Sequence, residues 1–140
     1  MVLPEDDANR QLANGFLLDL ATQQIQVLPV AGGWSQVLER FKSDHLSGME
    51  AYPDRFMVLL IDFDGKADRL NRAKDIIPGH LTDRVFILGV RTEPEALRKA
   101  NFGSYETIGR AMAMDCRKGT DTAWGHGLLR HNAPELDRLR

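Results

Sequence analysis

The feature that most constrains this chain is an unbroken apolar run at residues 56–61, which ends on Asp62, Phe63, Asp64 and Gly65. A run rich in Val, Ile and Leu, without polar alternation, is typical of a strand buried on both faces of a parallel sheet. Ligands of open α/β sheets bind beyond the carboxyl ends of the strands. Asp62 and Asp64 therefore stand where we expect chemistry.

The chemistry that two such carboxylates favour is cation binding. Groups this close repel each other unless one of them holds a proton or a cation lies between them. Hard oxygen ligands favour Mg²⁺ or Mn²⁺. The same residues could instead form an ordinary strand-to-helix turn in which an Asp caps the helix. The motif alone leaves both interpretations open.

Other apolar runs alternate with helical patterns through the first two thirds of the chain. Strands are predicted at residues 2–3, 25–30, 56–61 and 85–90. Helices are predicted at residues 9–23, 34–41 and 66–77, whereas residues 44–55 lack periodicity and predict a loop. This alternation predicts an open parallel sheet of four strands with helices on both faces.

We expect the four strands, numbered along the chain, to lie in the order 2-1-3-4. Right-handed crossovers leave few topologies, and this order places the first and third strands side by side. Glu5, which follows the first strand, would then lie near Asp62 and Asp64. Three carboxylates at one sheet edge could hold one or two divalent cations.

The last third of the chain has helical patterns and no evident strand. Helices are predicted at residues 94–100 and 105–118, the second capped by Ser104. Residues 120–122 predict the cap of a final helical turn. We therefore expect one domain over residues 1–140, with a core at 1–92 and a helical extension at 93–140 packed on the sheet.

Composition excludes several kinds of protein. The net charge of -2 gives no global attraction to nucleic acid or anionic membranes, so any nucleic-acid contact must come from a local basic patch. The single Cys excludes an internal disulfide and a multi-Cys metal site. No apolar run approaches membrane-spanning length, and no basic stretch followed by an apolar one opens the chain. We expect a cytoplasmic protein without membrane contact.

Three motifs in chain order resemble the Toprim family, the metal-dependent domain of topoisomerases, bacterial primases and OLD-type nucleases. They are Glu5 after the first strand, Gly32 and Gly33 after the second, and Asp62-x-Asp64 with its following glycine after the third. The resemblance covers about residues 1–90. It implies phosphodiester chemistry on DNA or RNA with Mg²⁺ or Mn²⁺, by a nuclease or a nucleic-acid-processing accessory factor.

The resemblance also implies roles for individual residues. Glu5 would be the acid–base carboxylate and a candidate metal ligand. Asp62 and Asp64 would be metal ligands and part of the catalytic set. Asp68, one helical turn further on, would be an additional or water-mediated ligand.

Candidate substrate-binding residues flank these motifs. Arg91 directly follows the last predicted strand, so it starts near the site, and arginine binds phosphate through two parallel hydrogen bonds. Lys66, Gly32 and Gly33 complete the set. Because the chain is small and slightly acidic, we expect a partner protein to supply part of the surface that binds a long nucleic acid.

Two other functional classes remain open at this point. A receiver-like phosphoacceptor domain also needs acids after its first strand, as at Asp6 and Asp7, and an Asp that ends its third strand, as at Asp62. Thr92 would supply its hydroxyl, but nothing after residue 90 predicts the fifth strand ending in Lys that such domains need. The third class is an interaction module that keeps the fold and performs no chemistry.

Overall fold

The centre of the protein is a sheet of three parallel strands. The computed structural model describes residues 1–18, 25–100 and 103–139. Its strands are β1 (Val2–Pro4), β2 (Met57–Leu60) and β3 (Val85–Leu88), hydrogen-bonded in the order β1-β2-β3. β3 is buried along its whole length, and β2 nearly so. An open parallel sheet with apolar strands is therefore confirmed.

The prediction of four strands in the order 2-1-3-4 is wrong. Residues 25–30 form no strand and make one parallel bridge, between Val27 and Val2. On this side of β1, Val2 donates its N–H to Gln26 O at 2.8 Å, and its carbonyl accepts from Leu28 N at 2.8 Å. The next residue of β1 that faces this way is Pro4, which has no N–H to donate. The ladder therefore stops after a single bridge.

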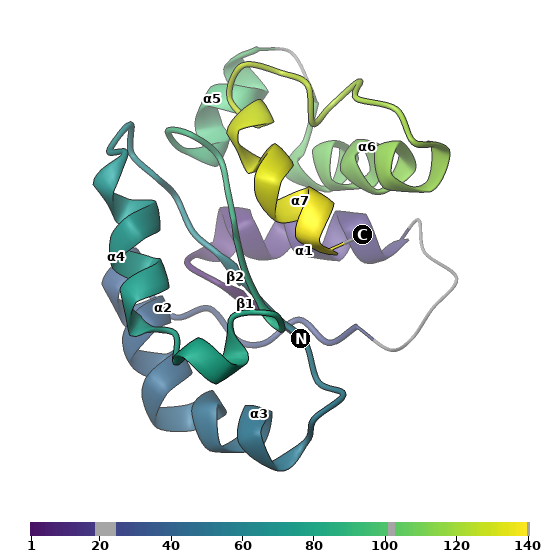
Figure 1. Ribbon diagram of the computed structural model, residues 1–140. Helices are drawn as coiled ribbons and strands as arrows, with labels where there is room; N and C mark the ends of the chain where they lie inside the picture. The colour runs from purple at the N-terminus through teal and green to yellow at the C-terminus, as the bar shows by residue number, and fades with distance from the viewer. Residues whose placement is uncertain (19–24, 101–102, 140) are drawn as a thin grey trace.

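One face of the sheet is covered by helices from the middle of the chain (Figure 1). They are α2 (Trp34–Arg40), α3 (Leu46–Ala51) and α4 (Asp68–Ile76). A π-helical turn at Phe41–His45 joins α2 to α3, and a 3₁₀ turn (Gly79–Leu81) precedes β3. The loop prediction for residues 44–55 is therefore wrong over 44–51. Fully buried Phe41 and Met49 anchor this stretch, so tertiary packing rather than local periodicity stabilises the helix.

The opposite face is covered by helices from the two ends of the chain (Figure 1). They are α1 (Asp7–Leu18), α5 (Pro94–Lys99), α6 (Tyr105–Lys118) and α7 (Ala133–Leu139). The prediction of helices on both faces is confirmed, as is the Ser104 cap, whose Oγ accepts from Thr107 N at 3.2 Å. Residues 19–23 of the predicted first helix lie outside the described residues.

The final helix begins later than the sequence predicts. Residues 120–129 form turns, a 3₁₀ turn follows at Arg130–Asn132, and α7 comes after it. α7 is only seven residues long and has Pro134 at its start, so it carries too little periodicity to be recognised from sequence alone.

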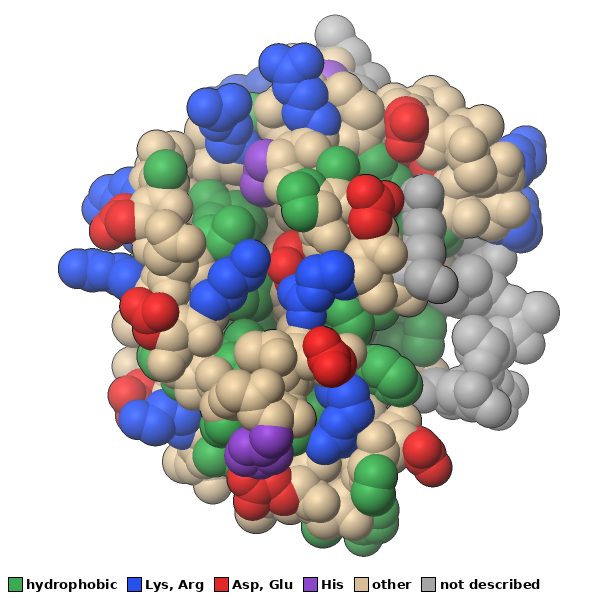
Figure 2. All heavy atoms as spheres, viewed as in Figure 1, with side chains coloured by type: hydrophobic (Ala, Val, Ile, Leu, Met, Phe, Trp, Pro, Cys, Tyr) green, Lys and Arg blue, Asp and Glu red, His purple; other side chains and the backbone are tan. Residues whose placement is uncertain are grey.

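The surface carries charges of both signs. Figure 2 shows Lys and Arg side chains interspersed with Asp and Glu over the face seen in Figure 1. None of the helices in the described ranges is long and apolar enough to cross a membrane.

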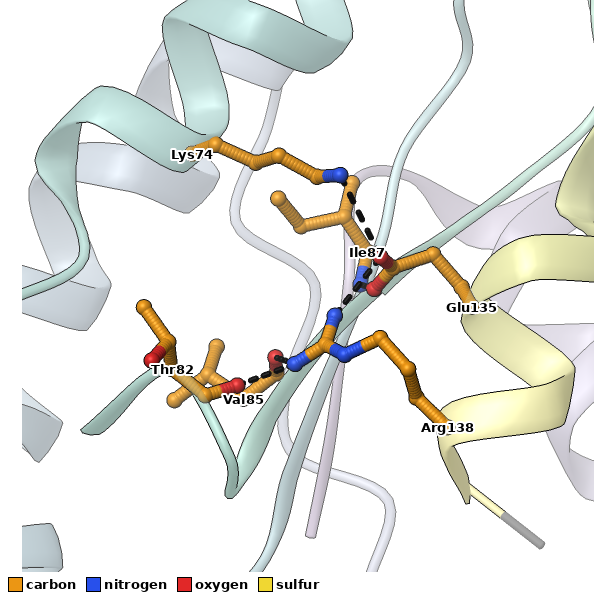
Figure 3. Close-up of polar contacts among 6 residues, drawn as sticks. All are labelled: Lys74, Thr82, Val85, Ile87, Glu135 and Arg138. Atoms are coloured by element: carbon orange, nitrogen blue, oxygen red, sulfur yellow. Dashed lines mark hydrogen bonds and ion pairs between the residues drawn. The ribbon is translucent and has the colours of Figure 1, made fainter. Parts of the chain in front are cut away.

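Side chains from the C-terminal segment form hydrogen bonds with backbone groups at the outer edge of β3. Glu135 Oε2 accepts from Ile87 N at 3.1 Å, and Asn132 bonds both backbone groups of Gly89, at 3.1 Å and 2.9 Å. Glu135 is 4% exposed and pairs with Arg138 at 2.6 Å and Lys74 at 3.4 Å (Figure 3). An open strand edge is a template for pairing with another chain, and these side chains occupy it.

Candidate functional site

The carboxyl ends of β1 and β2 bring Glu5 and Asp62 together. The strand ladder continues one residue beyond β1, because Glu5 N donates to Leu60 O at 2.9 Å. The Glu5 side chain then turns toward the neighbouring strand, and its Oε2 accepts from Asp62 N at 2.6 Å. Both side chains are buried. Two carboxyl-bearing residues predicted from separate parts of the sequence are therefore in direct contact.

Asn9 links Asp62 to the start of α1. Asp6 Oδ1 caps this helix by accepting from Asn9 N at 3.0 Å. The Asn9 side chain is fully buried, and its Nδ2 donates to Asp62 Oδ1 at 2.9 Å and to Asp6 Oδ1 at 3.1 Å. One amide group thus holds two acidic side chains in place.

Crowding and burial disfavour negative charge at this sheet edge. The pKa of Asp62 is raised to about 7: burial is the largest cause, the Asn9 hydrogen bond opposes it, and the negative charges of Glu5, Asp6 and Glu95 add to it. Burial also raises the pKa of Glu5, against the lowering effect of the Asp62 N–H. A positive charge placed here would relieve the repulsion among these groups.

Asp64 lies in the same turn but has a different partner. Its backbone adopts a left-handed conformation with φ of 48°, and Gly65 follows with φ of 68°. The turn rests on the segment after β3: Asp64 N donates to Thr92 O at 3.0 Å, and Gly65 N donates to Arg91 O at 2.8 Å. The Asp64 side chain is 47% exposed and forms an ion pair with Arg69 Nη1 at 2.8 Å.

The remaining predicted residues surround this edge at different distances. Gly32 N donates to Glu5 O at 2.8 Å, so the glycine turn of Gly32 and Gly33 lies directly beside Glu5. Arg91 is exposed and bonded through its backbone to the turn of Asp64. Lys66 is exposed at the end of that turn. Asp68 is exposed at the start of α4 and pairs with Arg72 at 3.5 Å.

The donor set suits a hard cation in its chemistry, but the side chains are not gathered around one point. Oxygen ligands from Glu5, Asp62 and Asp64 are the kind that Mg²⁺ and Mn²⁺ prefer. Within the described residues, however, no three His, Cys, Asp or Glu side chains form a cluster that could hold a metal ion. Asp64 is the member that stands apart, because Arg69 holds it.

One cavity among the described residues lies away from these carboxylates. An apolar cavity of about 220 Å³ lies between α1, α6 and the sheet, where Leu12, Phe16, Val58 and Met112 line it. None of the candidate carboxylates lines this cavity.

Comparison with known proteins finds no matching family model, curated protein or solved structure.

The sequence predicts Asn9 only as the first residue of a helix, with no role in the site. It places Arg69 among several basic residues in the second half of the chain, which either line the carboxyl edge of the sheet or lie on solvated helix faces. Asn9 lies at the third position after Asp6, where a capped helix turns its side chain back toward the cap. Arg69 gives no such local signal, because its partners Asp62 and Asp64 precede it across a turn.

Proposed function

We propose that this protein carries out metal-dependent phosphodiester chemistry on nucleic acid, as a nuclease or a nucleic-acid-processing accessory factor. Mg²⁺ or Mn²⁺ would be the cofactor, with Glu5, Asp62 and Asp64 as its ligands. The observation that carries the proposal is the 2.6 Å contact between Glu5 Oε2 and Asp62 N, which joins the first and third motifs of the Toprim-like pattern.

Each acidic residue has a distinct task in this proposal. A bound divalent cation would polarise a phosphoryl oxygen and stabilise charge on the leaving oxygen. Glu5 would move a proton as the acid–base group, because burial raises its pKa toward the range where a carboxyl can do so. Asn9 and the Glu5–Asp62 contact would keep the buried carboxylates oriented. Asp68 would contribute through water, since it points to Arg72.

Substrate binding would be local. Arg91, Lys66 and the Gly32–Gly33 turn surround the carboxylates and would contact phosphates of the nucleic acid. Because basic and acidic side chains are interspersed over the face in Figure 2, the affinity for a long duplex would be modest and sensitive to salt. A protein partner would add to it.

The receiver-like alternative uses the same Asp62 as a phosphate acceptor. In its favour, Thr92 Oγ1 is buried without a hydrogen-bond partner among the described residues, and the backbone of Thr92 bonds the turn of Asp64. Against it, no strand follows β3 in the described residues, so no fifth strand is available there to carry the lysine. An interaction module of the same fold is the third alternative.

The deciding experiment is incubation of the protein with plasmid and with single-stranded DNA and RNA, in Mn²⁺ or in chelator. We expect Mn²⁺-dependent nicking or cleavage that Asp62→Asn reduces at least about 100-fold, the usual cost of losing a catalytic ligand or proton-transfer group. Asp75→Asn is the matched control, because Asp75 is an exposed acid on α4.

Other results would reject the proposal. Cleavage that survives chelator, or that Asp62→Asn leaves unchanged, would point to a contaminating nuclease. Labelling of Asp62 by acetyl phosphate without cleavage would favour the receiver-like alternative. Neither cleavage nor labelling would favour the interaction module.

A further inference from the structure

Arg69 forms an ion pair with only one of the two acidic side chains of the Asp62–Asp64 turn. Asp62 is 7% exposed and hydrogen-bonded to Asn9, whereas Asp64 extends toward solvent and pairs with Arg69. The same Nη1 that contacts Asp64 also donates to Asp62 O at 2.8 Å. One guanidinium nitrogen therefore holds both ends of the turn.

The guanidinium is itself firmly held, even without Asp64. Arg69 is 7% exposed, and its Cζ lies 4.7 Å from the centroid of the Trp34 ring, a cation–π contact. The backbone oxygen of Asp62 accepts from it independently of the Asp64 side chain. Loss of the ion pair to Asp64 would thus leave Arg69 in position.

The hydrogen-bonding capacity of Arg69 is only partly used. Both of its described hydrogen-bonded or ionic contacts start at Nη1. Its Nε is buried and has no partner among the described residues. A buried donor without a partner carries a free-energy cost, and guanidinium groups have five N–H donors arranged for two-point contact with phosphate or carboxylate. The arrangement leaves a buried cation with donors to spare beside the candidate metal ligands.

A divalent cation at this edge would compete with Arg69 for the Asp64 carboxylate. Because both are positive, a cation that recruited Asp64 would repel the guanidinium and break its ion pair with that carboxylate. The guanidinium, still in position, would then lack an anionic partner, and the substrate of the proposed function is a phosphodiester.

We infer that Arg69 is the phosphate-binding residue of this site: Asp64 passes from Arg69 to the divalent cation, and Arg69, still held by Trp34 and Asp62 O, binds a phosphate oxygen of the substrate. The inference rests on the proposed function, because it requires both a cation and a phosphate ester. It assigns to Arg69 two opposite effects, weaker cation binding and stronger phosphate binding.

These opposite effects can be measured separately by calorimetry. The first titration uses Mn²⁺ alone, and the second uses thymidine bisphosphate at saturating Mn²⁺. We expect Arg69→Gln to bind Mn²⁺ about tenfold more tightly, because one neighbouring positive charge is removed. We expect it to bind the bisphosphate at least about tenfold more weakly, because a charge-assisted hydrogen bond is lost.

The variant Arg69→Lys distinguishes the effect of the positive charge from that of the planar guanidinium geometry. It keeps the positive charge, so its Mn²⁺ affinity should stay close to that of the wild type. It lacks the planar fork of donors, so its bisphosphate affinity should still fall. Arg110→Gln, which removes an exposed arginine from α6, controls for the change in net charge and should alter neither titration. Circular dichroism establishes that each variant is folded.

The possible failures are distinct. If the wild type binds no Mn²⁺, the proposed function fails and the role of Arg69 fails with it. If the wild type binds Mn²⁺ but Arg69→Gln and Arg69→Lys both bind Mn²⁺ and the bisphosphate as the wild type does, Arg69 is only a structural partner of Asp64. A parallel loss of both affinities in Arg69→Lys would also overturn the inference, since it would mean that the turn itself had been disrupted.

Discussion

Asp115 shows how one buried side chain directs the chain from α6 into the terminal segment. It is 2% exposed and accepts four hydrogen bonds, from Thr120 Oγ1 at 2.7 Å and from three successive backbone N–H groups. Those groups belong to Thr122, Ala123 and Trp124, at 3.1, 2.6 and 3.0 Å. Burial alone would raise the pKa of Asp115, but these hydrogen bonds together outweigh it and lower the pKa.

We predict that Asp115→Asn lowers the free energy of unfolding by about 2–3 kcal/mol at pH 7, because charge-assisted hydrogen bonds are lost and the Asn amide can place donors against donors. The folded pKa of Asp115 lies below the ordinary value of 3.8, so the ionised group stabilises the fold above that pH. Its contribution is lost as the pH falls through the folded pKa.

Urea denaturation from pH 7 to pH 2 measures this effect. The gap in stability between wild type and Asp115→Asn should be constant near neutral pH and should narrow below about pH 4. Asp121→Asn, an exposed acid in the same turn, is the control and should change stability little. A gap that widens toward low pH would contradict the assigned role.

No local pattern in the sequence singles out Asp115. Residues 120–122 were predicted to cap a helical turn, and Thr120 and Thr122 do take part in a polar turn. Their acceptor, however, lies in the last turns of α6. The three backbone donors converge on it only after the chain has reversed, and such convergence is a property of the folded chain.

Close approach of α1 and α6 is the main feature at the scale of elements. A Cβ atom on Gly109 would lie 2.0 Å from Leu12 O, and one on Gly15 would lie 2.1 Å from Glu106 O. Glycine inside a helix costs about 1 kcal/mol relative to alanine. These two glycines offset that cost by letting two backbones meet without side chains between them.

Gly109→Ala should therefore destabilise the protein by about 1–3 kcal/mol, because the obstructing atoms belong to the α1 backbone and cannot rotate away. Gly48→Ala is the matched control. Gly48 is also helical, but an added Cβ would meet only the mobile end of Arg55, so the change should be neutral or stabilising by up to about 1 kcal/mol. Thermal or urea denaturation of both variants checks the prediction, and equal effects would refute it.

Three of the four predicted strands and most of the helices lie where the sequence predicts them. Apolar periodicity and the Ser104 cap located α2, α4 and α6 within a few residues. Residues 25–30 have the apolar composition of a strand, yet their pairing depends on a donor that Pro4 lacks. Strand pairing is decided by the neighbouring segment, so a pattern within one segment cannot settle it.

The candidate site, like the sheet, was predictable only in part. Glu5 and Asp62 meet because both end neighbouring parallel strands, and that follows from the alternation of the sequence. Asp64 was expected beside them, but a left-handed turn and Arg69 direct it away. Spacing along the chain can place a residue at a sheet edge, whereas the direction of its side chain depends on partners that spacing does not identify.

At the scale of the whole molecule, the sheet separates two apolar clusters. The first, under α2, α3 and α4, includes Leu59 and Ile87, with Trp34 packed against it. The second, under α1, α5, α6 and α7, includes Leu60, Leu88 and buried Trp124. Adjacent residues of the same strands thus contribute to both clusters, and the extension after residue 92 supplies much of the second.

We predict that the two clusters unfold as one cooperative unit, because neither can lose its packing without disrupting β2 and β3. Each cluster has its own tryptophan. In Trp124→Phe the fluorescence reports on the first cluster through Trp34, and in Trp34→Phe it reports on the second through Trp124. Within each variant, the urea transition followed by fluorescence should coincide with that followed by far-ultraviolet circular dichroism.

Separation of the curves would have a specific meaning. If Trp124 lost its native signal at lower urea than the backbone signal, the extension would unfold before the sheet and would be a separate folding unit. That outcome is disfavoured by the way the extension is attached. Asn132 and Glu135 bond the backbone of Gly89 and Ile87 at the edge of β3, so α7 cannot leave without exposing unpaired groups of the central sheet. Because those groups belong to the strand that carries Ile87 and Leu88 into the two clusters, loss of the extension and loss of the sheet should be a single event.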